Sequence, residues 1–272
     1  KTTENISIDA ELNETSWKDA EIATDFVSLE PKNGTPIPEE FKTEVKILYS
    51  NDAIYIGAKL YDPNPEKILK ELVERDEIGT SDFFGIFING YNDGQQEFRF
   101  FVTAANGQVD TNFTSSEGED GSWNAIWESN AKITDFGYVI EMKIPYAALR
   151  FPEKDKQIWG LNFFREVRRE RQKYTWSPID NKIGAISQQA GLLTGIENIN
   201  GADAYAIKNG KSTLYYDVKT GFKVAEAKDI EQGGQKMTQT TYYQDYKDVK
   251  GLKFPYKTIM NVGIEIELTT SE

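Results

Sequence analysis

The amino-acid sequence predicts an all-β protein, with an antiparallel β-sandwich over residues 1–200 and a small antiparallel β-meander or half-barrel over residues 201–272. Short runs of alternating apolar and polar residues recur along the chain, and turn signals separate them. The composition changes near residue 200, because all five tryptophans and all seven arginines precede it. The net charge of −13 also arises before this point, since residues 201–272 carry ten lysines and ten acidic residues. Such a change indicates a boundary between two domains.

The clearest strands lie within residues 120–165. Between residues 138 and 144, apolar side chains occupy every second position, as in a strand with one face in a core. These apolar residues are Tyr138, Ile140, Met142 and Ile144. Pro145 ends the pattern, and Trp159, Leu161 and Phe163 repeat it after a short helical turn. We therefore expect two core strands on either side of that turn.

The segments before residue 120 are predicted to form strands with little helix. Residues 6–21 are typical of a short strand and a helical turn, whose Trp17 anchors the N-terminus in the core. Residues 64–76 carry apolar side chains at helical spacing and predict a short helix. Hairpin turns are predicted at Ser50-Asn51-Asp52, Asn92-Asp93-Gly94 and Asn106-Gly107.

The segments after residue 165 continue the antiparallel pattern. Residues 166–178 are expected to turn around Arg169–Gln172 and to return through Tyr174 and Trp176. In the second domain, closely spaced turn signals predict a meander. These signals are Asn209-Gly210, Lys219-Thr220-Gly221, Gly233-Gly234 and Lys250-Gly251.

The charge balance and the absence of two residue types exclude several functions. The chain is acidic, and its one basic cluster comprises Arg165, Arg168, Arg169 and Arg171, so we expect neither nucleic acid nor an anionic membrane as a partner. No cysteine and no histidine is present, which removes thiolate and imidazole metal ligands and the commonest general base. No apolar run approaches the roughly 18 residues of a membrane span, and no signal peptide begins the chain. We expect a mature or trimmed N-terminus.

Calcium is the one metal that the remaining ligand types favour. Carboxylates and carbonyls suit calcium, and the acidic turn at residues 117–121 is the best candidate to bind it. The predicted ligands are Asp93, Asp110, Glu119 and Asp120. The alternative is a solvated acidic turn that binds no metal.

Several segments, taken in order, resemble a known family. They are IDAELNETSWKDAEIATDF, TEVKILYSNDAIYIGAKLYD, DGSWNAIWES, GYVIEMKIPYAALRFP and IWGLNFFREVRRERQKYTWSP. Together they resemble the carbohydrate-binding family 9-like N-terminal domain of large Bacteroidetes outer-membrane proteins of unknown function, over about residues 5–199. The resemblance implies a β-sandwich, sugar binding and a place in the bacterial cell envelope, either periplasmic or at the cell surface.

The second domain resembles something different. From about residue 202, YYDVKTGFKV and YQDYKDVKGLKFPYK are similar to the half-barrel tail that follows Bacteroidetes zinc-peptidase domains and to lipoprotein-sorting folds. The peptidase motif His-Glu-x-x-His is absent, since the chain has no histidine. A natural fusion or an engineered chimera of two pieces would explain both the change of resemblance and the change of composition.

The first functional hypothesis is a non-catalytic carbohydrate-binding module. Flat aromatic rings cover the apolar face of a sugar while amides and charged groups bond its hydroxyls. Trp123, Trp127 and Trp176 are the predicted platform because they lie at strand ends or in loops. Their predicted polar partners are Asn162, Arg165 and Glu141 on neighbouring strands. The competing interpretation is that these tryptophans belong to the core.

Two other functions remain open from the sequence. One is a scaffold that binds a protein or lipid, such as an outer-membrane barrel or another envelope protein. The other is a glycoside hydrolase with paired carboxylates, for which no pair among the 44 acidic residues is singled out by spacing. Binding to a glycan array would separate the sugar-binding hypothesis from the scaffold hypothesis.

Overall fold

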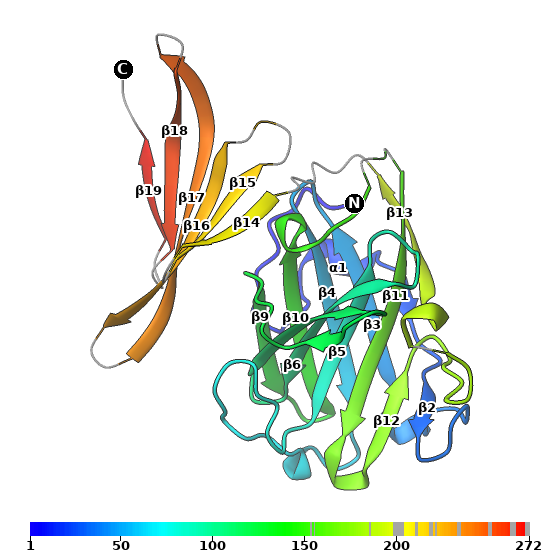
Figure 1. Ribbon diagram of the computed structural model, residues 1–272. Coiled ribbons are helices and arrows are strands. Elements are labelled where there is room, and N and C mark those ends of the chain that lie inside the picture. The colour runs from blue at the N-terminus through cyan, green and yellow to red at the C-terminus, as the bar shows by residue number, and fades with distance from the viewer. Residues whose placement is uncertain are drawn as a thin grey trace. The chain divides into compact units, whose positions relative to one another are not determined.

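The computed structural model confirms an all-β fold made of antiparallel sheets (Figure 1). It describes residues 1–152, 154, 156–184, 186–197, 204–209, 212–217, 220, 222–232, 235–249, 252–261 and 265–269. The chain separates into two compact units, Lys1–Gly201 and Ala202–Glu272, which we call the N-terminal and C-terminal units. No helix in the described ranges is long and apolar enough to cross a membrane.

The N-terminal unit is a sandwich of two antiparallel sheets. The smaller sheet has the strand order β1-β3-β4-β10-β9. Its strands are β1 (Ile22–Ala23), β3 (Thr43–Tyr49), β4 (Ala53–Tyr61), β9 (Glu128–Ile133) and β10 (Gly137–Pro145). The β3–β4 hairpin turns at Ser50-Asn51-Asp52, where the Ser50 N–H donates to the Ala53 carbonyl at 2.9 Å, as the sequence predicts.

The larger sheet has the order β2-β12-β11-β5-β6-β7-β8, and β13 also pairs with β11. Its first strands are β2 (Val27–Glu30), β5 (Phe83–Asn89), β6 (Gln96–Thr103), β7 (Gln108–Thr114) and β8 (Gly118–Asp120). The others are β11 (Lys156–Val167), β12 (Gln172–Thr175) and β13 (Gly191–Glu197). The predicted hairpin turns between β5 and β6 and between β6 and β7 are confirmed.

Helices in the described residues are single turns that link strands. The α-helix α1 spans Thr15–Lys18 and carries Trp17, which is 1% exposed and therefore anchors the N-terminal segment as predicted. The 3-10 turns are η1 (Glu39–Phe41), η2 (Pro65–Lys67), η3 (Tyr146–Ala148), η4 (Arg168–Glu170) and η5 (Ile186–Gln189).

The core lies between the two sheets and follows the period-two pattern of the sequence. The predicted strand at 138–144 is β10, and its four apolar residues are all fully buried. Trp159, Leu161 and Phe163 of β11 face them from the larger sheet. Successive side chains of a strand point to opposite faces, so the intervening residues of β11 lie on the outer face of the larger sheet.

That outer face carries a second apolar cluster. Phe83, Phe87, Phe101 and Phe164 pack together there, with ring centroids 5.5–6.0 Å apart. Side chains from the connecting segments complete the cluster, namely Ile78, Ile179 and Ile186. The segment between β12 and β13 is therefore held against the sheet, and this segment carries η5.

A buried carboxylate fixes the N-terminal segment to the outer face of the smaller sheet. Glu141 of β10 accepts hydrogen bonds at Oε2 from the backbone N–H groups of Asp9 (3.0 Å) and Ala10 (2.9 Å). Its Oε1 accepts from the Trp17 indole N–H at 3.1 Å. Burial raises the pKa of Glu141 to about 7 even though these hydrogen bonds lower it.

The C-terminal unit is a single antiparallel meander in the described residues. Its strands are β14 (Ala204–Asn209), β15 (Ser212–Asp217), β16 (Lys223–Gln232), β17 (Gln235–Val249), β18 (Leu252–Asn261) and β19 (Glu265–Thr269), hydrogen-bonded in that order. Ala225 and Thr240 are its two buried residues among those described. The four predicted turn signals lie wholly or partly outside the described residues.

The predicted helix at residues 64–76 is wrong. Only η2 is helical there, and the chain then continues without regular structure, with turns at 75–76 and 79–80, until β5 begins. Ile68 alone enters the core, whereas Leu72 is 89% exposed. The backbone of this segment bonds instead to the two residues directly before β5. The Asp82 N–H donates to the Leu69 carbonyl at 2.9 Å, and the Glu71 N–H donates to the Ser81 hydroxyl at 2.7 Å. These contacts outweigh the helical spacing of the apolar residues.

Replacing Glu141 by glutamine should destabilise the N-terminal unit, because an amide NH₂ would face buried N–H donors that now bond a carboxylate. We expect the free energy of unfolding to fall by about 2–4 kcal/mol. Urea unfolding at pH 8, above the pKa of this carboxyl, measures the change. The control is Glu11→Gln, which removes a solvent-exposed ion pair with Lys132. Equal unfolding midpoints for both variants would contradict the assigned role of Glu141.

Candidate functional site

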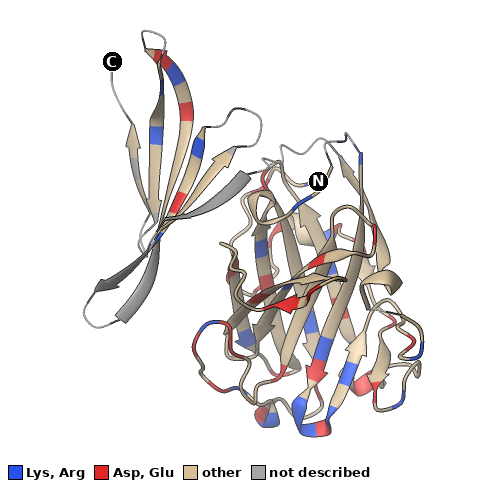
Figure 2. Cartoon of the chain, in the orientation of Figure 1, with Lys and Arg blue, Asp and Glu red and all other residues tan. Residues whose placement is uncertain are grey.

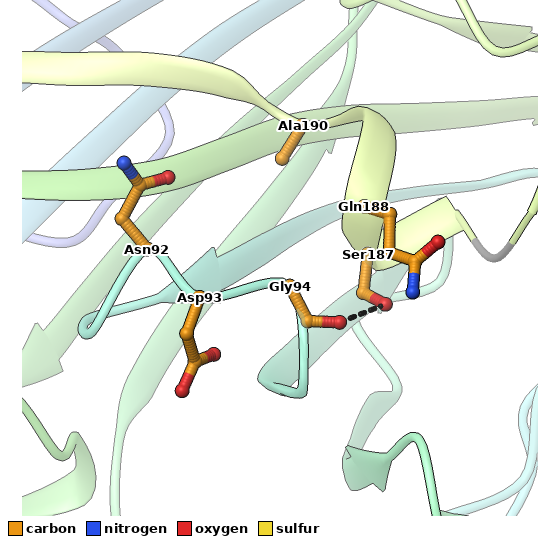
Figure 3. Close-up of a pocket in the computed structure, with 6 residues that line it drawn as sticks. All are labelled: Asn92, Asp93, Gly94, Ser187, Gln188 and Ala190. Atoms are coloured by element: carbon orange, nitrogen blue, oxygen red, sulfur yellow. Dashed lines mark hydrogen bonds between the residues drawn. The ribbon is translucent and has the colours of Figure 1, made fainter.

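A surface pocket of about 210 Å³ lies where the β5–β6 turn meets η5. Its lining residues come from two segments that are far apart in the sequence, as Figure 3 shows. They are Asn92, Asp93 and Gly94 from the turn, and Ser187, Gln188 and Ala190 from η5 and the residue that precedes β13. The pocket is open to solvent and its walls are mostly polar.

The turn can approach η5 because of its backbone conformation. Asn92 and Gly94 both have positive φ, at 52° and 69°, which closes the tight β5–β6 connection. A Cβ atom at Gly94 would lie 3.2 Å from the Gln188 Cγ, so glycine permits the close contact. The Ser187 hydroxyl donates to the Gly94 carbonyl at 2.9 Å and joins the two walls.

Gly160 of β11 lies between the two walls. A Cβ atom built at this position would be 3.4 Å from the Asn92 Oδ1 and 3.5 Å from the Ala190 Cβ. Both of those residues line the pocket. The missing side chain of Gly160 therefore leaves the space between the walls open.

Asp93 supplies the one charge among the lining residues. Its Oδ1 accepts from the Asn89 side-chain amide at 3.1 Å and from the Gln95 N–H at 2.9 Å. Burial raises the pKa of Asp93, but these hydrogen bonds outweigh that effect and hold the pKa below its ordinary value. The carboxylate is therefore ionised at neutral pH.

The other polar side chains at the rim are exposed and free to bond a ligand. In the described part of the chain, the hydrogen bonds do not use the side-chain amides of Asn92 or Gln188, and both residues are exposed. Tyr91, which precedes Asn92 in the turn, is 49% exposed and is the one exposed aromatic residue among those described in the N-terminal unit. The pocket thus presents two amides and a carboxylate, and an exposed aromatic residue directly precedes its first lining residue in the chain.

The three tryptophans predicted as a platform do not form one surface. Trp127 is 5% exposed, its indole N–H donates to Asp110 at 3.0 Å, and its ring packs edge-on against Phe100. Trp123 is partly buried against Phe98, with the ring centroids 5.0 Å apart. Trp176 is partly buried against Phe163, with the ring centroids 5.8 Å apart.

The predicted polar partners of these tryptophans are buried and serve the fold. Glu141 holds the N-terminal segment. Asn162 clamps the chain after β12, because its Oδ1 accepts from the Ser177 N–H at 2.8 Å and its amide donates to the Ser177 carbonyl at 3.1 Å. Arg165 is fully buried between the sheets. None of these side chains reaches a ligand from this position, because each faces protein on all sides.

The four carboxylates predicted to bind calcium do not converge. In the ranges that the structure describes, no three acidic side chains gather closely enough to hold a metal ion. Asp110 is buried and bonds Arg75, Trp127 and the Ala125 N–H, while Glu119 pairs with Arg99. Asp120 accepts from Ser122, and Asp93 lies in the pocket. Calcium binding stays a prediction.

Two members of the arginine cluster, Arg168 and Arg169, are paired with neighbouring acids. Arg169 forms two hydrogen bonds of 2.7 Å with Asp62, and Arg168 pairs with Glu166 at 3.0 Å. Figure 2 shows basic and acidic residues side by side in the turn between β11 and β12. This turn therefore offers little positive charge to a phosphate group.

The pocket residues were not identified as a site from the sequence. The sequence predicts a turn at Asn92-Asp93-Gly94 and names Asp93 only as a calcium ligand, while the residues of η5 carry no signal of a site. Tyr91, directly before the Asn-Asp-Gly turn, is the one feature of the sequence that indicates a binding site here. The second wall comes from residues nearly a hundred positions away, which sequence spacing does not bring together.

The N-terminal unit is thus an antiparallel β-sandwich domain with an open polar pocket at its surface. The chain belongs to the carbohydrate family 9 binding domain-like family, whose model matches residues 8–177. This confirms the family 9-like resemblance of the N-terminal domain. Its resemblance to Bacteroidetes outer-membrane proteins and the resemblance of the C-terminal unit stay predictions.

Comparison with solved structures gives distant neighbours. A family 9 carbohydrate-binding module from Caldicellulosiruptor kristjanssonii in complex with cellotriose is 16% identical, with 70% of this chain and 89% of that chain covered and a TM-score of 0.48. Its complex with glucose gives 15% identity, coverage of 70% and 91%, and a TM-score of 0.49. A search of curated proteins finds no match.

Replacing Trp127 by alanine should destabilise the unit, because the ring belongs to the core. We expect a loss of about 3–5 kcal/mol in the free energy of unfolding. Tyr91→Ala removes an exposed ring and should change this quantity by no more than about 0.5 kcal/mol. Urea unfolding of both variants tests the assignment, and a destabilised Tyr91→Ala variant would show that this ring is structural.

Proposed function

We propose that the N-terminal unit is a non-catalytic carbohydrate-binding module and that the pocket between the β5–β6 turn and η5 holds the sugar. The observation that carries this proposal is the combination of family membership over residues 8–177 with a pocket whose exposed amides are unused in the described structure. The proposal assigns the aromatic contact to Tyr91 in place of the three tryptophans.

The chemistry of the pocket suits a neutral, hydroxyl-rich ligand. The amides of Asn92 and Gln188 can each donate and accept, which matches the dual character of a sugar hydroxyl. The ionised carboxylate of Asp93 can accept hydrogen bonds from sugar hydroxyls but cannot donate any. The exposed face of Tyr91 can cover apolar C–H groups of a pyranose ring. The polar groups would orient the sugar in the pocket, and the tyrosine ring would supply the apolar contact area.

The same pocket gives less support to hydrolysis. Glycoside hydrolases use two carboxyl groups on either side of the bond that is cleaved. The six lining residues include one carboxylate, Asp93, and its pKa is lowered, which is unsuited to a general acid. A binding role needs no second carboxyl group. The cell-envelope placement and the alternative of a protein- or lipid-binding scaffold stay predictions.

Alanine at any of three rim positions should weaken sugar binding. For Tyr91→Ala, Asn92→Ala and Gln188→Ala we expect losses of roughly threefold to tenfold each, since each removes one contact of ordinary strength. A glycan array first identifies a ligand of the full chain, and calorimetric titration then measures each variant. Asn13→Ala, an exposed amide on the N-terminal segment, is the matched control and should bind as the parent does. A parent protein that binds no glycan would refute the proposal.

Binding should be independent of pH across the neutral range. The pKa of Asp93 lies below the ordinary carboxyl value and the chain has no histidine, so no lining group changes charge between about pH 5 and pH 8. Affinity should fall only when the pH is low enough to protonate Asp93. Titrations at several pH values test this, and Asp93→Asn should remove the acid-side loss. If the affinity changed with a midpoint near neutral pH, a group other than Asp93 would be responsible for binding.

A further inference from the structure

Two exposed aliphatic side chains lie on the outer face of the larger sheet beside the pocket. Ile158 of β11 is 54% exposed and Leu192 of β13 is 57% exposed. Both belong to paired strands and not to loops. The neighbours of Ile158, Gln157 and Trp159, are buried, so Ile158 is the residue of this stretch that points outward. We call this pair the aliphatic strip.

The aliphatic strip begins where the pocket ends. Leu192 is directly opposite Gly160 in the β11–β13 pairing, and directly opposed residues share one face of a sheet. Leu192 also follows Ala190 by two positions, which places both on that face. Gly160 is the residue whose missing side chain separates the pocket residues Asn92 and Ala190. The surface is therefore continuous from the polar pocket to the strip.

No polar side chain separates Gly160 from Leu192, and the exposed polar neighbours of the strip, Thr194 and Lys156, lie on the side away from the pocket. Gly160 contributes no side chain, and Gly195, in the irregular part of the β11–β13 pairing, has open space around the position of a Cβ. Paired strands hold the two side chains in place, so a ligand would order little of the chain when it binds. Water in contact with two adjacent aliphatic groups is displaced favourably by an apolar ligand group.

We propose that the pocket and the aliphatic strip form one elongated site for a glycoside whose sugar carries an apolar aglycone, such as an alkyl chain. The inference rests on the proposed function of the pocket and names the chemical class of its ligand. The sugar would lie among Asn92, Asp93 and Gln188, and the alkyl group would cover Leu192 and Ile158. The ligand is thus polar at one end and apolar at the other, as the surface is.

A second sugar ring is a poorer match to the strip. Sugar rings bind through aromatic faces together with donors and acceptors for their hydroxyls. Ile158 and Leu192 offer neither, and a hydroxyl placed over them would lose its hydrogen bond to water. An alkyl chain has no such cost.

The test compares methyl and octyl β-D-glucopyranoside, the latter kept monomeric, by calorimetric titration of the full chain. We expect octyl glucoside to bind about tenfold more tightly, a gain that equals about 1.4 kcal/mol. Leu192→Thr and Ile158→Thr place a strand-forming polar residue at these positions and should remove the preference while methyl glucoside binds as before. Ile22→Thr, at an exposed isoleucine of the smaller sheet, is the control and should keep the preference.

The outcomes separate this inference from the proposed function. Asn92→Ala should weaken both glucosides, because the sugar is common to them. If methyl glucoside binds and the octyl chain adds nothing, the strip is not part of the site and the proposed function stands. If the threonine variants weaken cellotriose in place of octyl glucoside, the strip binds sugar units and the inference is overturned. Failure of both glucosides to bind counts against the proposed function and removes this inference with it.

Discussion

The sandwich depends on one buried cation that joins its two sheets. Arg165 projects from β11 into the interior and donates to the carbonyl oxygens of Phe41 (2.5 Å) and Tyr61 (2.7 Å). A third bond, of 2.8 Å, reaches the Thr43 hydroxyl. A fully buried guanidinium without such acceptors would cost several kcal/mol, so the ends of β3 and β4 are confined to positions where their oxygens meet it. Burial also lowers the pKa of Arg165.

The position of β11 in turn decides where the pocket lies. The same strand that carries Arg165 inward carries Asn162 and Gly160 outward. Asn162 clamps Ser177 and so directs the chain after β12 across the sheet, while Gly160 leaves the gap into which both pocket walls face. The second wall is further held by the apolar cluster beneath it, which includes Ile186. The inward-facing residues of β11 thus support the core, and its outward-facing residues support the pocket.

The fold can be predicted from the sequence because the patterns that indicate strands and turns are local. Period-two runs marked β10 and β11, and Asn-Gly or Asn-Asp-Gly turns marked the hairpins. The helix expected at 64–76 failed because its apolar spacing competes with backbone bonds to Ser81 and Asp82, which are invisible in a sequence. Trp127 lies outside the predicted platform for a related reason. A loop position does not say which way a ring turns, and Trp127 turns inward to a buried acceptor on Asp110. The pocket needs two distant segments and so escaped sequence reasoning.

Gly160 places a steric constraint on this surface. It lies in the middle of a paired strand, where a side chain would normally stabilise the sheet, and its outward position faces Asn92 and Ala190 and not the core. A Cβ atom at this position would also lie 3.2 Å from the Cβ of Asn89, so even the smallest side chain would push against the turn that forms one pocket wall. The width of the pocket therefore depends on the absence of a single side chain from a paired strand.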